Sequence, residues 1–164
     1  MRLDLRDIIQ IPGESVGFDY ETDLSDCADP PIKEIVGPAK VSGNIKNIAG
    51  VLTLTATLDL DAVFVCDRCL REETRHIHRD IKATLADNAQ DSEDPEMFPL
   101  YGNFADIDEI VVTAFLLGAE ESWLCRADCK GLCPQCGADL NDGPCSCTKE
   151  IDPRLAVLGQ FLEK

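Results

Sequence analysis

The chain has 164 residues, with 31 acidic side chains against 15 Lys and Arg, and a formal net charge of −16. This length fits one domain with at most a small appendage, and a hydrophobic content of 45% is typical of a folded globular protein. The charge argues against non-specific binding to nucleic acid, which depends on Lys and Arg displacing counterions, and against docking on an anionic membrane. We therefore expect no DNA and no membrane partner, whereas a basic protein partner or a local basic patch is compatible with the charge.

The sequence predicts a cytoplasmic protein with reduced cysteines. No apolar run approaches the roughly 18 residues of a membrane span, and residues 1–7 alternate in charge, unlike the apolar centre of a secretion signal. Nine cysteines in a reducing compartment are expected to be thiols. Clustered thiols in such a compartment are more often metal ligands than disulfides.

Alternating polarity predicts most elements in the first half of the chain. Residues 1–9 are expected to form a short strand, whereas residues 12–37 are rich in Pro, Gly and acids and show few periodic signals. Residues 40–48 predict a strand with Val41, Gly43 and Ile45 on one face, and residues 46–50 predict a turn. From residue 51 to 65 the alternation predicts a long half-buried strand, whose buried face holds Leu52, Leu54, Ala56, Leu58, Leu60, Ala62 and Phe64.

The second half of the chain mixes strand, loop and helix signals. Residues 70–85 predict a mostly polar strand, and residues 87–96, with five acids and no base, predict an exposed loop. Asp106, followed three residues later by Glu109, predicts a capping box at the start of a helix that extends to about Glu121. Asp152-Pro153 predicts the start of a short terminal helix.

These elements together predict a mainly β protein of the α+β class with an antiparallel β core, for which a barrel and a sandwich are both open. One long helix, a C-terminal zinc knuckle and the short terminal helix complete the architecture. We expect a β-rich core domain at residues 1–122, with the acidic loop 87–96 and the helix 106–121. A cysteine-rich zinc-binding segment and the terminal helix, residues 123–164, are expected to pack on this core.

Eight of the nine cysteines form four closely spaced pairs, and Cys27 stands alone as a free thiol. The strongest signal is the knuckle at residues 133–137, Cys-Pro-Gln-Cys-Gly, in which the glycine permits a positive φ and a close approach of backbone N–H to sulfur. Its natural mate is the Cys145 and Cys147 pair, because residues 141–144 can fold the chain back. The first predicted site therefore consists of Cys133, Cys136, Cys145 and Cys147.

The remaining pairs predict a second site made of Cys66, Cys69, Cys125 and Cys129. Its formation closes a loop of roughly sixty residues, so metal binding would offset a substantial chain entropy. The sequence thus predicts zinc as the cofactor, in two structural sites of four cysteines each. Two other arrangements stay open, in which Cys129 joins the knuckle or the pairs cross over.

Other interpretations of the cysteines compete with zinc. A redox motif at residues 66–69 would want its first cysteine at a helix N-terminus, whereas here the pair follows a strand. An iron–sulfur cluster also uses four cysteines, and packed structural thiols need no metal. Closed all-cysteine sites are structural rather than catalytic, so nothing in the cysteine pattern predicts an enzyme.

The remaining chemical residues give weaker signals. His76 and His78 lie two apart in a strand and are expected to be surface histidines, and Glu120 and Glu121 to be a solvated helix end. Three arginines four apart predict either a mixed-charge exposed strand or a face that contacts RNA phosphates. They are Arg71, Arg75 and Arg79. Because no aromatic residue interleaves with them, a stacking platform for single-stranded RNA is not expected.

Three stretches of the chain resemble the YceD family, called large ribosomal RNA subunit accumulation protein. They are Cys66-Asp-Arg-Cys-Leu70 after a long strand, the block from Cys129 to Asn141 followed by Cys145 and Cys147, and the closing Asp152-Pro-Arg-Leu155. The resemblance covers the chain from about residue 37 to its end. It implies a non-enzymatic factor needed in bacteria and plastids for accumulation or processing of 23S ribosomal RNA, and it supplies no catalytic residue.

The acidic charge shapes the functional expectation, because a factor acting directly on ribosomal RNA is usually basic. We expect the protein to bind a basic ribosomal protein of the large subunit, or the pre-ribosomal large-subunit particle, with complementary charge speeding the encounter. Direct contact with ribosomal RNA through the arginines is the second expectation. The alternative from another class is a zinc-dependent transcription regulator or a thiol-redox regulator.

Overall fold

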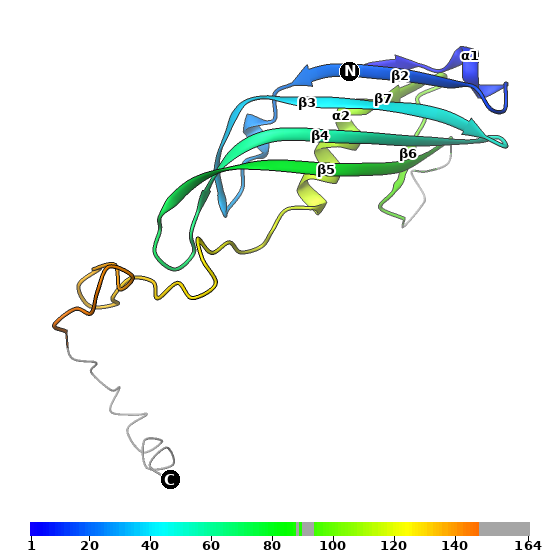
Figure 1. Ribbon diagram of the computed structural model, residues 1–164. Helices are drawn as coiled ribbons and strands as arrows, with labels where there is room; N and C mark the ends of the chain where they lie inside the picture. Colours follow the sequence, from blue (N-terminus) through cyan, green and yellow to red (C-terminus); the bar gives the residue numbers. More distant parts are fainter. Residues whose placement is uncertain (88, 90–93, 148–164) are drawn as a thin grey trace, which may run out of the picture.

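The structure is a computed structural model in which residues 1–87, 89 and 94–147 are described. Within these residues the chain forms one five-stranded sheet, one two-stranded sheet and two α-helices (Figure 1). The elements are β1 (Arg2–Asp4), α1 (Arg6–Ile9), β2 (Ser15–Thr22), the 3-10 turn η1 (Ser25–Cys27), β3 (Ile32–Ile48), β4 (Val51–Val65), β5 (Glu72–Ala86), β6 (Met97–Pro99), β7 (Phe104–Asp106) and α2 (Ile107–Leu117).

The large sheet is a meander in the order β2-β3-β4-β5-β6, antiparallel except for the short parallel pairing of β6 with β5. β4 confirms the predicted long strand, because all seven residues of its predicted inner face are buried. The predicted turn is also present, with positive φ at Ala49 and Gly50 between β3 and β4. The strand predicted at residues 70–85 is β5.

No strand was predicted at residues 12–37, but this stretch contains β2 and the first part of β3. β3 begins at Ile32 rather than Lys40, and its pairing with β4 shifts register between Ile32 and Glu34 and between Val36 and Lys40. These irregularities break the period of two, which hid the strand from the sequence pattern. Residues 1–9 form the strand β1 and then the short helix α1, where one strand was expected.

Helix α2 lies across one face of the sheet and buries Ile107, Ile110, Val111 and Phe115. It ends at Leu117, four residues before the predicted end. Asp106 occupies the N-cap position, but its side chain makes no capping hydrogen bond, because its carboxylate accepts from Arg2 instead. The predicted capping box is therefore absent at this helix.

The architecture is an open, curved sheet covered by a helix, and not the closed barrel that the sequence left open. Among the described residues β2 and β6 are the edge strands of the large sheet, and β1 pairs with β7 in a separate two-stranded sheet. The segment from residue 125 to 147 extends beyond the tip of the β4–β5 hairpin (Figure 1). The predicted terminal helix, and residues 88 and 90–93 of the predicted acidic loop, lie outside the described residues.

Candidate metal centres

The tip of the β4–β5 hairpin brings two cysteines to the segment that follows α2. The sulfur of Cys66 lies 3.8 Å from that of Cys129, and the sulfur of Cys69 lies 3.6 Å from that of Cys125. All four sulfurs lie within 4.8 Å of one another. We call these four residues the hairpin cluster, and they are the four that the sequence placed in one site.

A second group of four thiols lies farther along the chain. Its sulfurs also lie within 4.8 Å of one another, and we call this group the knuckle cluster. Its members are Cys133, Cys136, Cys145 and Cys147. Cys27 lies outside both clusters, as expected for a free thiol.

The spacing of the sulfurs fits one tetrahedral metal ion in each cluster. Metal–sulfur bonds of about 2.3 Å put the sulfurs of a tetrahedral site about 3.8 Å apart, close to the two distances found in the hairpin cluster. An iron–sulfur cluster places several atoms between its thiolates and needs a wider ring of ligands. The geometry is thus compatible with zinc. Cys66 follows a strand and precedes β5, so it also lacks the helix N-terminus that a thioredoxin-type redox site uses.

The two Cys-x-x-Cys turns have the same backbone geometry. The N–H of Leu70 donates to the carbonyl of Cys66 at 2.9 Å, and the N–H of Gly137 donates to the carbonyl of Cys133 at 2.9 Å. Both donors have positive φ, +58° for Leu70 and +73° for Gly137. The glycine in the knuckle therefore does what the sequence predicted, and Leu70 adopts the same conformation without being glycine.

Backbone N–H groups prepare the first thiol of each turn to ionise. In Cys133, N–H groups of Cys136 and Gln135 donate to sulfur and lower the pKa to about 6. Burial would raise the pKa of Cys66, but N–H groups of Cys125, Cys69 and Arg68 outweigh it and bring the pKa to about 6. The backbone donors thus favour the thiolate form of Cys66 and of Cys133.

Other thiols of the same clusters resist ionisation. Burial, together with the neighbouring sulfurs, raises the pKa of Cys125 to about 12. Hydrogen bonding to Cys136, followed by burial, raises the pKa of Cys147 to about 12. Four thiolates so close together need a cation to offset their charge, so a bound metal ion would replace the protons that remain.

The residues between the first two cysteines fasten the hairpin tip to the following segment. Asp67 accepts a hydrogen bond from the backbone N–H of Trp123 at 2.8 Å, and its own N–H donates to the Trp123 carbonyl at 3.0 Å. Arg68 donates to the carbonyl of Cys129 at 2.9 Å, and its carbonyl accepts from the N–H of Leu132 at 3.0 Å. Sequence reasoning missed these roles, although both residues lie inside the Cys-x-x-Cys motif.

Asn141 links the two clusters and was also missed. Its amide donates to the sulfur of Cys129 at 3.4 Å, and its side-chain oxygen accepts from the N–H of Lys130 at 2.8 Å. The pKa of Cys129 is lowered, first of all by this amide. Asn141 thus holds one ligand of the hairpin cluster from a position inside the sequence of the knuckle cluster.

The three predicted arginines all face the segment that leaves α2. Arg71 lies 3.3 Å from Asp139 and 3.9 Å from Asp142. Arg79 donates to the carbonyl of Gly118 at the end of α2. Arg75 lies over two aromatic rings, 5.4 Å from the centre of Phe64 and 5.8 Å from that of Trp123. No aromatic residue interleaves with the arginines in the sequence, and the two rings beside Arg75 come from β4 and from the segment after α2; both are buried.

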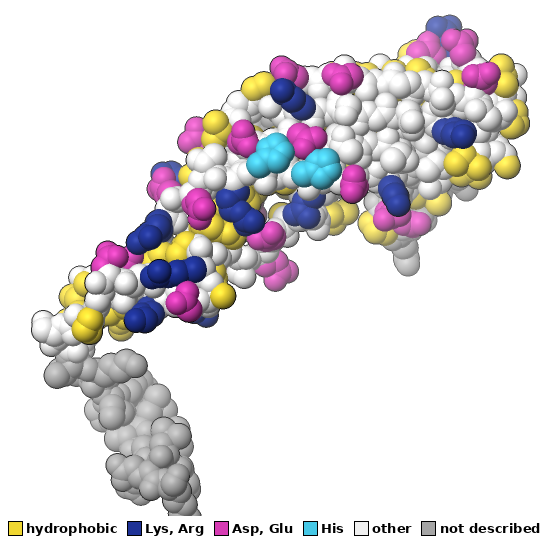
Figure 2. Space-filling model, viewed as in Figure 1, with side chains coloured by type: hydrophobic (Ala, Val, Ile, Leu, Met, Phe, Trp, Pro, Cys, Tyr) yellow, Lys and Arg dark blue, Asp and Glu magenta, His cyan; other side chains and the backbone are white. Residues whose placement is uncertain are grey.

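His76 and His78 lie on the outer, exposed face of the sheet, as predicted. Asp59 and Asp61 of β4 lie opposite them in the register. Both ring nitrogens of His76 face carboxylates, Nδ1 at 2.9 Å from Asp61 and Nε2 at 3.2 Å from Asp59. Both contacts are hydrogen bonds only when the ring carries two protons, and they raise the pKa of His76. Figure 2 shows the two rings side by side among acidic side chains.

A family model described as large ribosomal RNA subunit accumulation protein YceD matches residues 54–162, which include all eight clustered cysteines. The chain belongs to the YceD family. This membership confirms the resemblance drawn from the cysteine motifs. The match begins inside β4, so it takes in the hairpin tip, α2 and both clusters.

Two curated relatives of this YceD protein come from mycobacteria. They are the uncharacterized protein Mb2951c of Mycobacterium bovis and the uncharacterized protein Rv2926c of Mycobacterium tuberculosis, each 30% identical over 122 residues. The aligned part is 72% of this chain but 59% of each relative. No solved structure matches the chain. No helix in the described part of the YceD protein is long and apolar enough to span a membrane.

The first prediction concerns metal content. Protein purified without chelator is expected to hold two zinc ions per chain, one for each four thiolates, as measured by elemental analysis. Cys69→Ser and Cys133→Ser should each remove one ion, whereas Cys27→Ser, a matched loss of one thiol outside the clusters, should keep both. A folded protein without metal would contradict the assignment.

The second prediction concerns Asn141. Asn141→Ala removes the N–H donor to Cys129 and should lower the metal affinity of the hairpin cluster by about 10- to 100-fold, as is typical for groups that orient metal ligands. Competition with a chromogenic chelator measures the affinity. Gln135→Ala is the control, because it deletes an exposed amide within the knuckle that makes no side-chain hydrogen bond in the described part of the chain. Equal loss in both variants would show that Asn141 has no special role.

The third prediction concerns pH. The folded-state pKa of His76 lies above the unfolded value, so its contribution to stability is present below pH of about 6.5 and is lost as pH rises through the folded pKa. Urea unfolding should show that His76→Gln destabilises more at mildly acidic than at alkaline pH. Thr74→Gln, on the same face of β5, should show no such dependence. An NMR titration midpoint of His76 at or below its ordinary value would contradict the prediction.

Proposed function

We propose that this YceD protein is a non-enzymatic factor in biogenesis of the large ribosomal subunit, acting in the cytoplasm to promote accumulation or processing of 23S ribosomal RNA. The observation that carries the proposal is the family match, which spans both thiol clusters. The clusters support a structural role for metal. Each offers four sulfurs around one centre, which would fill all four positions of a tetrahedral metal ion and leave none open for a substrate.

Zinc is the cofactor that we propose for both clusters. The hairpin cluster would hold one ion through Cys66, Cys69, Cys125 and Cys129, and the knuckle cluster would hold the other through its own four sulfurs. Zinc supplies crosslinking here, and the chain supplies backbone donors that stabilise the thiolates. On this proposal, residues from 123 onward are a metal-dependent extension that packs on the β core of residues 1–122.

A basic protein of the large subunit is the partner that the charge supports best. Acidic residues outnumber Lys and Arg by 31 to 15, and such a surface attracts a basic chain at low salt. Direct contact with ribosomal RNA through Arg71, Arg75 and Arg79 is the second part of the proposal. Arg71 already forms an ion pair with Asp139, and Arg79 already donates to the carbonyl of Gly118 at the end of α2. We therefore expect Arg75 to make the main contact with RNA.

The fourth prediction tests the function in cells depleted of the protein. Sucrose gradients should show fewer large subunits, and the ratio of 23S to 16S RNA from the same cells should fall. Complementation with Cys27→Ser should restore both, whereas Cys66→Ser and Cys133→Ser should not. An unchanged ratio on depletion would sink the proposal. Recovery of a ribosomal protein from lysate at low salt, lost at high salt, would identify the partner.

A thiol-redox or zinc-dependent transcription regulator makes a different prediction for the same cysteines. A regulator needs a reactive or labile pair, so alkylation of the loaded protein would modify one pair first. Structural zinc sites should instead protect all eight thiols uniformly until a chelator removes the metal.

A further inference from the structure

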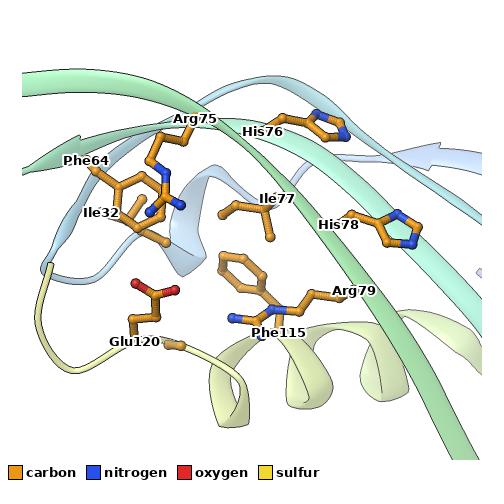
Figure 3. Close-up of a pocket in the computed structure, with 10 residues that line it drawn as sticks. Ile32, Phe64, Arg75, His76, Ile77, His78, Arg79, Phe115 and Glu120 are labelled. Atoms are coloured by element: carbon orange, nitrogen blue, oxygen red, sulfur yellow. The ribbon is translucent and has the colours of Figure 1, made fainter. Parts of the chain in front are cut away.

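A cavity of 170 Å³ lies between the inner face of β5 and the chain that leaves α2 (Figure 3). Four of the residues that line it are apolar: Ile32, Phe64, Ile77 and Phe115. Its rim carries the guanidinium groups of Arg75 and Arg79 and the carboxylate of Glu120. It therefore combines apolar side chains with opposite charges at its mouth.

The size of the cavity limits what it can hold. A cavity of about 150 Å³ accommodates one benzene ring, whereas cofactor and drug sites have volumes of about 300 to 1,000 Å³. At 170 Å³ this cavity fits a single six-membered ring and is too small for a whole nucleotide cofactor. The occupant is therefore one ring or one side chain of a larger molecule.

The rim groups are available to an occupant. In the described part of the chain no carboxylate lies within ion-pair distance of Arg75, whose guanidinium rests on the rings of Phe64 and Trp123. Glu120 likewise makes no ion pair with any described residue, and its carboxylate points toward the cavity in Figure 3. The mouth thus presents donors on one side and an acceptor on the other.

The open edge of β5 adds backbone groups to the same cavity. His76 and His78 border it although their rings point away from it (Figure 3). Thr84, in the same alternation, gives its N–H to Glu96 and not to β4, and β6 pairs only with Thr84–Ala86. The N–H and C=O groups of His76 and His78 therefore point away from β4, along an edge without a strand partner among the described residues.

The rim excludes several simple occupants. A Lys or Arg side chain would meet two guanidinium groups, and a carboxylate could pair with the guanidinium groups but would leave Glu120 without a donor. An aliphatic side chain would take Arg75 and Glu120 out of water without giving them a partner, which is costly. A planar ring that carries both acceptors and a donor along its edge satisfies all of these groups.

We propose that this cavity takes one unpaired pyrimidine base of ribosomal RNA, with cytosine preferred. The inference rests on the proposed function and names the RNA contact that the function would use. The amino group of cytosine donates to Glu120, and its ring nitrogen and carbonyl accept from the guanidinium groups. The guanidinium plane of Arg75 and the ring of Phe115 offer the flat surfaces on which unstacked bases are held. Uracil places a carbonyl where cytosine has the amino group, so Glu120 repels it.

The fifth prediction uses Trp123 as a built-in reporter, because it is the only tryptophan and its ring lies 5.8 Å from Arg75. The zinc-loaded chain of 164 residues is titrated with short single-stranded oligocytidylate, oligouridylate and a duplex RNA. Oligocytidylate should quench the fluorescence with saturation. Oligouridylate should bind at least about fivefold more weakly, because it has no amino group to donate to Glu120. The duplex should not quench, because its bases are paired and stacked. Absence of saturable quenching by oligocytidylate would overturn the proposal.

Matched variants separate base binding from general charge. Arg75→Gln and Ala119→Leu, which fills the mouth, should weaken oligocytidylate binding by about fivefold or more. Glu120→Gln should abolish the preference for cytosine. Lys82→Gln and Glu121→Gln make the same charge changes outside the cavity and should alter affinity by about twofold or less. Circular dichroism and zinc content verify folding. Equal effects of Arg75→Gln and Lys82→Gln would overturn the pocket.

Failure of this inference can be told apart from failure of the proposed function. If oligocytidylate does not bind but depletion still lowers large subunits, the cavity has another occupant, such as a partner's side chain, and only the base pocket is wrong. If depletion changes nothing while oligocytidylate quenches Trp123 in the Arg75-dependent manner, the pocket stands and the ribosomal role falls.

Discussion

Mutual repulsion among thiolates is the constraint on which this molecule depends. Four sulfurs within 4.8 Å of one another cannot all be charged without a cation at their centre, and this situation occurs twice. The hairpin cluster is the more consequential, because its two halves are separated by the whole of β5 and α2 in sequence. Around it, Asp67 holds Trp123 and Arg68 holds Cys129, so the contacts between the sheet and the segment 123–147 converge on one point.

Charged residues are also distributed unevenly along the chain. Residues 87–122 hold ten acids and no Lys or Arg, whereas residues 66–86 hold five Lys or Arg and four acids. Figure 2 shows several basic side chains, with acidic ones among them, toward the narrow end of the molecule. Each zinc site with four thiolates would carry a formal charge of about −2, so nearby cations such as Arg71 partly offset the clusters. A basic protein on the acidic body and an RNA base at the narrow end are thus electrostatically compatible.

The sequence predicted best the features that rest on regular local patterns, namely the alternating strand β4 and the closely spaced cysteines. The alternation of β4 is a local pattern and was predicted correctly. The cysteines lie in the two groups of four that their spacing favoured, although the sequence left other arrangements open. The start of β3 was not predicted because register shifts interrupt its period of two. β2 was overlooked although Val16, Phe18 and Tyr20 alternate with Gly17, Asp19 and Glu21 and its register with β3 is unbroken. The capping role of Asp106 failed because Arg2, 104 residues away, competes for its carboxylate. The contact of Arg75 with the rings of Phe64 and Trp123 could not be predicted, because these residues are distant from Arg75 in the sequence and meet it only in the folded chain.

The two Cys-x-x-Cys turns share a backbone conformation that the sequence indicated at only one of them. A glycine after the second cysteine marked the knuckle at residue 137, but the hairpin turn has Leu70 at the equivalent position with the same positive φ. A non-glycine residue in this conformation costs about 1 kcal/mol, and its side chain is 61% exposed, so packing does not compensate. The surrounding hydrogen bonds of Cys66, Asp67 and Arg68 offset that cost. These bonds therefore hold the conformation of Leu70 and join the hairpin tip to the segment beyond α2 in one structural unit.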